Sequence, residues 1–163
     1  MTAAVAIVRA GGDGDKRWFY GGGLHTWKAT SDETGGALIA FEDFVTQGKA
    51  TPMHRHAEAD EALYVIEGQI LVHIDGVEHP IGTGGFSFAP RGVAHAFTVT
   101  SPTARLLTVQ TPGIGGQAFF TDASDPTDQI TPEGPVDFAR VGQAAKTTGA
   151  TEILGPPPFG PAH

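Results

Sequence analysis

The feature that most constrains this fold is a series of short apolar segments, each separated from the next by a turn. Between residues 17 and 111 these segments are rich in β-branched and aromatic residues, and DETGG, DGV, GTGG and PRG lie between them. Glycine and proline number 23 and 12, which favours many short strands over a few long helices. Strands at such close spacing are typical of an antiparallel sandwich or barrel. The sequence therefore predicts an all-β fold.

The expected strands are spread along the first two thirds of the chain. They span residues 3–8, 17–22, 24–30, 37–45, 61–68, 69–75, 77–81, 86–90, 94–100 and 104–111. The last third predicts one helix, from about Pro135 to Thr147, with Gly149 beyond its end. Residues 151–163 are expected to be irregular because proline is dense there. With no internal repeat, we expect a single domain over 1–163, with a barrel core at about 17–111 and a partly helical C-terminal extension at about 112–163.

The charge and composition exclude several classes of function. The net charge of −8 repels phosphate backbones and anionic membranes, so nucleic-acid and membrane partners are not expected. The absence of cysteine excludes disulfides, thiolate ligands and a cysteine nucleophile. No apolar run approaches the roughly 20 residues of a membrane helix, and the first residues lack the basic region of a signal peptide. We therefore expect a cytoplasmic protein.

Two histidines in TPMHRHAEA are candidates for chemistry. If this stretch is a strand, His54 and His56 point to the same face because the side-chain period of a strand is two residues. Neutral imidazole is the commonest metal ligand at physiological pH. On its own, however, such a pair is more often a polar edge strand whose histidines face water.

Two further residues favour a metal site. Glu61 opens the expected strand EALYVIEG and shares a face with Leu63 and Val65, where an unpaired carboxylate would be costly. His95 likewise alternates with apolar residues in VAHAFTV. If the register of the strand differs, Glu58 or Asp60 is the alternative carboxylate.

Other polar residues are left out of the expected site. His25, His73 and His79 have no partner at ligand spacing, and His73 is expected on the outer face of its strand. Tyr64, on the face opposite Glu61, is assigned to packing.

These residues fall into two motifs that resemble those of the cupin superfamily. The first is Gly48-x5-His54-x-His56-x4-Glu61-x6-Gly68, and the second is Gly84-x5-Pro90-x-Gly92-x2-His95. One departure is Val99, at the position where the second motif usually ends in asparagine. The resemblance covers residues 48–95 and implies a double-stranded β-helix, or jelly-roll, barrel.

The resemblance also implies a cofactor and a subunit arrangement. It implies one divalent transition metal per chain inside the barrel, bound by His54, His56, Glu61 and His95. Three imidazoles and a carboxylate suit Fe, Ni, Mn, Co, Cu or Zn, and the ligand types do not select among these ions. Small cupins commonly form homodimers, so the resemblance implies a homodimer here.

The side chains expected on the inward faces of the strands indicate which class of reaction the site could catalyse. An apolar substrate pocket is expected from Leu63, Phe86, Phe88 and Phe97, and no inward lysine, arginine or second carboxylate was identified. A sugar isomerase would need such polar groups, whereas an oxygenase acting on an aromatic compound needs an apolar cavity.

The chain further resembles small single-domain cupins of the quercetin 2,3-dioxygenase type, in part through the pair Phe119 and Phe120. In those relatives the glutamate binds the metal and acts as the base, which implies a catalytic role for Glu61. The sequence thus predicts a metal-dependent dioxygenase whose partners are a small aromatic or enol-containing compound and O2. The alternatives are a non-redox isomerase, cyclase or lyase, and a cupin that binds a small molecule without catalysis.

Overall fold

The computed structural model describes residues 3–19, 22–127 and 135–160. The elements in chain order are β1 (Lys16–Phe19), β2 (Gly23–Ala29), β3 (Ile39–Thr46), β4 (Met53–Arg55), β5 (Asp60–Glu67), β6 (Gln69–Ile74), β7 (Val77–Gly82), β8 (Phe86–Ala89), β9 (His95–Val99), β10 (Thr103–Thr111), α1 (Gly116–Asp122), β11 (Ser124–Pro126), α2 (Phe138–Thr148) and β12 (Glu152–Gly155). Within the described ranges, no helix is long and apolar enough to span a membrane.

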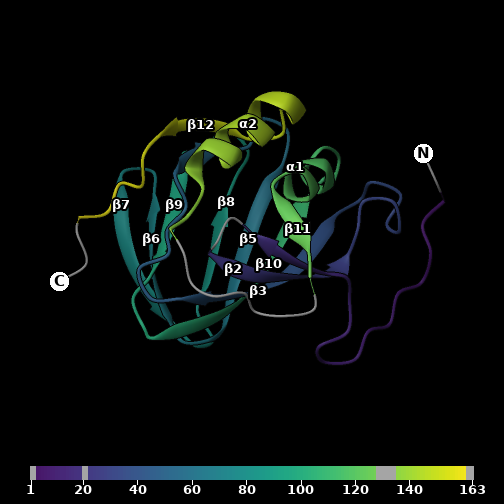
Figure 1. The fold of residues 1–163 in the computed structure, drawn as a ribbon, viewed down its shortest axis with the longest axis horizontal. Coiled ribbons are helices and arrows are strands. Elements are labelled where there is room, and N and C mark those ends of the chain that lie inside the picture. The colour runs from purple at the N-terminus through teal and green to yellow at the C-terminus, as the bar shows by residue number, and fades with distance from the viewer. Residues whose placement is uncertain (1–2, 20–21, 128–134, 161–163) are drawn as a thin grey trace.

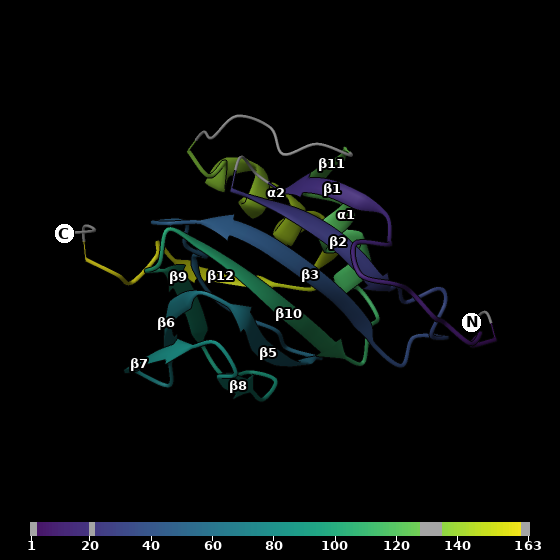
Figure 2. The same cartoon turned by 90° about the horizontal axis from the view of Figure 1, so that it is seen from below.

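The strands form two antiparallel sheets that face each other as layers (Figures 1 and 2). In the described part of the chain, the larger sheet has the order β11-β1-β2-β3-β10-β5-β8, and the smaller has the order β12-β4-β9-β6-β7. Strands distant in sequence are neighbours in both sheets, as in a jelly roll. The predicted all-β jelly-roll barrel with a partly helical C-terminal extension is therefore confirmed.

One apolar core lies between the two sheets. It follows from the alternation within each strand: Leu63 and Val65 of β5 are buried, whereas Tyr64 between them is exposed. The members of this core are Val45, Leu63, Val65, Ile70, Val72, Val99, Ala104 and Leu106. Fully burying one such aliphatic side chain contributes about 1.5–3 kcal/mol, so this layer holds the sheets together.

A second core lies where the C-terminal helices meet the larger sheet, and it places α1 and α2 over one end of the barrel (Figure 1). Phe119 and Phe120 of α1 pack with Trp27 and Phe41 of the sheet. The expected helix near residue 135 is α2. It begins after Asp137, whose side chain accepts a hydrogen bond from the Arg140 amide, and it ends at Gly149 with φ of 67°.

Two expectations at the ends of the chain are wrong. Residues 3–8 form no strand, and most of their side chains are exposed, because they pair with neither sheet. Residues 151–163 are not wholly irregular, since Glu152–Gly155 form β12 beside β4. The proline run starts only at Pro156 and leaves the ladder positions of β12 free to pair. Residues 20–21 of the expected strand 17–22 and residues 161–163 of the expected irregular segment lie outside the described ranges.

Candidate metal centre

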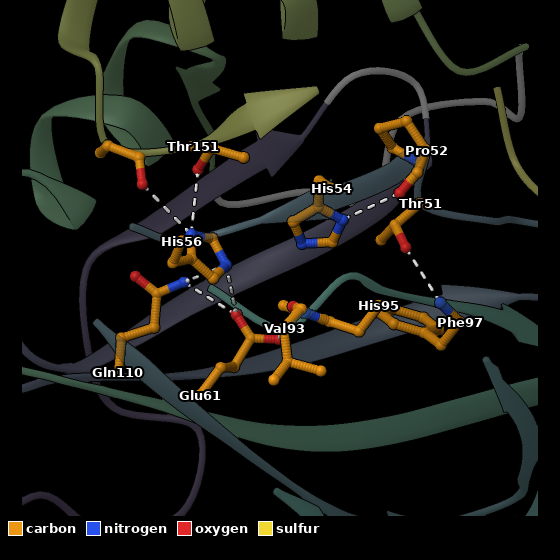
Figure 3. Close-up of polar contacts among 11 residues, drawn as sticks. Thr51, Pro52, His54, His56, Glu61, Val93, His95, Phe97, Gln110 and Thr151 are labelled. Carbon is orange, nitrogen blue, oxygen red and sulfur yellow. Dashed lines mark hydrogen bonds and ion pairs between the residues drawn. The ribbon is translucent and has the colours of Figure 1, made fainter. Parts of the chain in front are cut away.

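Neighbouring strands of the smaller sheet bring two of the candidate ligands together. His54 on β4 is the register partner of His95 on β9, so both rings leave the same face of the sheet (Figure 3). Their ring centroids are 4.4 Å apart. The C-terminal strand β12 pairs with the other edge of β4, and the ion pair between Arg55 and Glu152 (2.7 Å) supports this contact.

The other two candidate ligands come from just beyond β4 and from the opposite sheet. His56 follows β4, and its carbonyl accepts a hydrogen bond from the Gly92 amide (2.7 Å), in the turn that leads to β9. Glu61 lies near the start of β5, with Gln110 of β10 and Ala89 of β8 as register partners. Alternation along β5 turns Glu61 inward with Leu63, as the sequence pattern predicts.

These residues form one compact cluster. One ligand atom from each of His54, His56, Glu61 and His95 lies within 4.8 Å of the others, and the three imidazoles are buried. A set of three nitrogen donors and one oxygen donor is suited to a divalent transition metal. The four residues therefore form a possible metal site.

Hydrogen bonds orient all three imidazoles in the same way. Each ring directs Nδ1 at a main-chain carbonyl: His54 at Pro52 (2.8 Å), His95 at Val93 (2.9 Å) and His56 at Ala150 (3.2 Å). A carbonyl only accepts, so Nδ1 carries the hydrogen and the Nε2 lone pair is left for another partner. This arrangement is typical of metal-ligating histidines.

The contacts of Glu61 supply a test of whether a cation fits. Its two carboxylate oxygens lie 3.1 Å from His56 Nε2 and 3.3 Å from His95 Nε2. With Nδ1 protonated, each contact sets a lone pair against a carboxylate unless a proton or a cation lies between them. The residues therefore fit a shared metal ion.

Gln110 is a polar member of the site that the sequence analysis missed. Its side chain is buried, and Nε2 donates to Glu61 Oε2 (2.8 Å) and lies 3.2 Å from His56 Nε2. It is in phase with the inward residues Leu106 and Thr108 of β10, and this alternation could have identified it. Gln110 restrains the carboxylate of Glu61.

The pKa values of three of the clustered residues, His54, Glu61 and His95, are shifted in the metal-free protein. Burial, together with the neighbouring His95 and His56, lowers the pKa of His54 to about 3. Burial alone would raise the pKa of Glu61, but the hydrogen bonds and charges of His56 and His95 hold it well below its usual value. Burial opposes protonation of His95, yet Glu61 raises the pKa of that ring. The cluster thus combines an ionised carboxylate with an imidazole that stays neutral.

The neighbouring acids are directed away from the cluster. Asp60 forms a two-point ion pair with Arg91 (2.9 and 3.1 Å), and this hydrogen bonding lowers the pKa of Asp60 to about 2. Glu58 is exposed. Glu61 is thus the acid that lies with the histidines, and the alternative register is not adopted.

An open cavity runs from the cluster into the barrel. It is lined by His54, His56 and Glu61, and its apolar walls include Phe19, Phe41, Phe97, Phe119 and Phe120. The cavity is open to solvent, and most of its lining side chains are apolar, as in many small-molecule sites. Of the expected pocket residues, Phe97 lines this cavity, whereas Leu63 packs into the core between the sheets.

The expected inward orientation of Phe86 and Phe88 is wrong. Their side chains are 61% and 49% exposed. The register of β8 with β5 decides this, because Ala89 pairs with Glu61 and turns inward. The phenylalanines consequently share the outer face with Tyr64.

A second carboxylate and a lysine, Asp43 and Lys49, line the cavity, contrary to the expectation from the sequence. Asp43 lines the cavity, between the buried Phe41 and Val45 of β3. Its register partner on β2 is His25, whose ring is buried and whose Nδ1 lies 3.1 Å from Asp43 Oδ1. The alternation of ALIAFEDFV places Asp43 in phase with its apolar neighbours and could have revealed it.

Comparison with known proteins finds one curated relative and many solved structures with a similar fold. The chain is 30% identical over 123 residues to quercetin 2,3-dioxygenase from Bacillus subtilis, an alignment that covers 76% of this chain and 36% of that protein. The chain therefore spans about a third of the length of this relative.

Two solved structures illustrate the shared fold. KdgF from a Halomonas species has a TM-score of 0.58 at 18% identity, over 68% of this chain and 94% of its own. An RmlC-like cupin from Shewanella frigidimarina has a TM-score of 0.59 at 21% identity, over 66% of this chain and 92% of its own. A family model described as a cupin domain matches residues 40–110, which include all four clustered residues. From the matched model, the jelly-roll topology and the two motifs, we conclude that residues 40–110 of this chain form a cupin domain.

Proposed function

We propose that this chain binds one divalent transition metal through His54, His56, Glu61 and His95 and is a dioxygenase that acts on a small aromatic or enol-containing compound. The observation that carries the proposal is the aromatic cavity that opens directly onto the four-residue cluster. The similarity to a quercetin 2,3-dioxygenase supports the same substrate class.

Glu61 is the proposed base. When bound, the metal supplies Lewis acidity that favours the enolate form of the substrate. Glu61 accepts the proton of the enol hydroxyl on a carboxylate oxygen, and the Gln110 amide holds that carboxylate in place. The phenyl rings of Phe41 and Phe97 bound the space for the substrate.

Substitution of Glu61 by glutamine tests this role. Glu61→Gln keeps the shape of the side chain but removes its charge, so oxygen uptake with a flavonol should fall by about a hundredfold to ten-thousandfold, while metal content falls only modestly. Glu58→Gln and Asp60→Asn are the controls, because neither side chain lies with the histidines. Near-normal oxygen uptake by Glu61→Gln would show that Glu61 is not the base.

A non-redox isomerase, cyclase or lyase is the second candidate. Asp43 favours it, since a second carboxylate in the cavity could move a proton within the substrate. Product formation without oxygen consumption would select this activity. Binding of the compound with no product would select a non-catalytic cupin.

A homodimer and a cytoplasmic location belong to the same proposal. The exposed Tyr64, Phe86 and Phe88 lie on one outer face of β5 and β8, and exposed apolar patches often mark interaction surfaces. We also treat the barrel and its C-terminal extension as one functional domain, because Phe119 and Phe120 of the extension line the cavity.

A further inference from the structure

The cavity has a second polar region, away from the four clustered residues. His25 and Asp43 are register partners on β2 and β3, so both side chains leave the inner face of the larger sheet. The ring of His25 is 1% exposed and the side chain of Asp43 is 16% exposed. A carboxylate only accepts, so His25 Nδ1 donates to Asp43 Oδ1 and fixes the orientation of the carboxylate.

This pair leaves hydrogen-bonding capacity unused. His25 lies against the rings of Trp27, Phe41 and Phe120, with centroids 4.8, 4.0 and 5.2 Å away, and its Nε2 has no partner among the described residues. The structure likewise shows no described donor to Asp43 Oδ2, although Asp43 lines the cavity. Buried polar groups are nearly always hydrogen-bonded. Because Asp43 lines the cavity, its second carboxylate oxygen is available to accept a hydrogen bond from a ligand there.

The strand register gives the separation of Asp43 from Glu61. On β10, Gln110 pairs with Glu61 of β5, and Leu106 pairs with Asp43 of β3. Asp43 and Glu61 are therefore offset by four residues along the strand direction and by two strands across the sheet, which corresponds to about 16 Å between their backbones. Both side chains leave the inner face of the same sheet and line the cavity. The span suits a molecule of two or three rings and exceeds that of a single ring.

We propose that Asp43, oriented by His25, is a binding subsite for a hydroxyl group at the end of a multi-ring phenolic substrate opposite to its enol. The inference rests on the proposed function, which places the enol at Glu61. Asp43 Oδ2 only accepts hydrogen bonds, so the distal group must be a donor such as a phenolic hydroxyl. Fully methylated analogues, which have no hydrogen-bond donor, are disfavoured by the same chemistry.

Ligand affinity tests this subsite without catalysis. The Zn²⁺-loaded protein is titrated under anaerobic conditions with quercetin, which carries hydroxyls on its distal rings, and with 3-hydroxyflavone, which has only the enol hydroxyl. One hydrogen bond to a charged acceptor should make quercetin bind at least about tenfold more tightly. Equal affinities for the two compounds would overturn the proposal, and this comparison needs no variant.

Asp43→Asn then assigns the preference to a residue. Its carbonyl still accepts from His25, but its amide offers the distal hydroxyl only a neutral hydrogen bond in place of one to a charged carboxylate. The preference for quercetin should therefore fall to less than about threefold, while 3-hydroxyflavone binds unchanged. Glu42→Gln is the control, because Glu42 is on the same strand and pairs with Arg105 on the outer face. A loss of affinity for both compounds alike would show that Asp43 is only structural.

The test separates this inference from the proposed function. Hydroxyl-dependent binding without oxygen uptake would refute the dioxygenase and retain the subsite. Oxygen uptake with equal affinities for the two compounds would retain the dioxygenase and refute the subsite. Failure of both compounds to bind would overturn the subsite.

Discussion

Substitution of Gln110 probes how far the metal site depends on a residue that is not a ligand. Its Nε2 donates a 2.8 Å hydrogen bond to the carboxylate of Glu61, and the side chain is buried against the histidines. Gln110→Leu removes the donor while nearly keeping the volume. The carboxylate of Glu61 would then no longer be held in one orientation, and its buried charge would lose a stabilising hydrogen bond.

Two estimates of the effect agree. A hydrogen bond to a charged group contributes about 1.5–3 kcal/mol, which corresponds to about a tenfold to 150-fold change in an equilibrium constant. Changes in residues that hydrogen-bond to metal ligands typically reduce metal affinity by about 10–100-fold. We therefore expect Gln110→Leu to weaken Zn²⁺ binding by about one to two orders of magnitude.

Competition with a chelating indicator measures this change. Gln143→Leu is the matched control, since Gln143 is exposed on α2. Gly116→Ala should act in the same direction but less strongly, because a Cβ there would lie 2.5 Å from Gln110 Oε1 and would displace that side chain. Zn²⁺ affinity of Gln110→Leu within threefold of the wild type would refute the role given to Gln110.

Three further outcomes are expected. The purified protein should contain close to one transition-metal ion per chain by elemental analysis, and His54→Ala/His56→Ala should lose the ion but stay folded; full occupancy in this variant would mean that other residues are the ligands. In metal-free protein the unfolded state protonates His54 near pH 6.5, whereas the pKa of folded His54 is about 3. The unfolded state therefore binds more protons between these values, and His54 should reduce stability by up to about 1.4 kcal/mol per unit as pH falls through this window. Urea denaturation of wild type and His54→Gln at pH 7 and pH 5 measures this, and an equal difference between the two proteins at both pH values would contradict it. Sedimentation should show a dimer that Phe86→Ser/Phe88→Ser weakens, because these side chains are exposed on one face; a monomeric wild type would refute it.

Local patterns predicted the parts of the structure that depend on one strand and its alternation. The phase of EALYVIEG placed Glu61 with Leu63 and Val65, and the structure has this phase. Asp43 and Gln110 obey the same rule and could have been predicted, since each alternates with buried neighbours. At Phe86 and Phe88 hydrophobicity alone predicts the wrong face of the strand, because the small residues Ser87 and Ala89 face inward instead.

The sequence by itself determined the antiparallel all-β class, the turns, and the set of histidines and acids that can share a face, because each follows from residue type and a period of two. Only the tertiary structure decided which of these faces meet. Pairing of β4 with β9 set His54 beside His95, and the packing of the two sheets brought Glu61 to them. Pairing of β2 with β3 joined His25 to Asp43. The physical reason is that strand order and register are set by contacts between segments far apart in the chain, which no local pattern encodes.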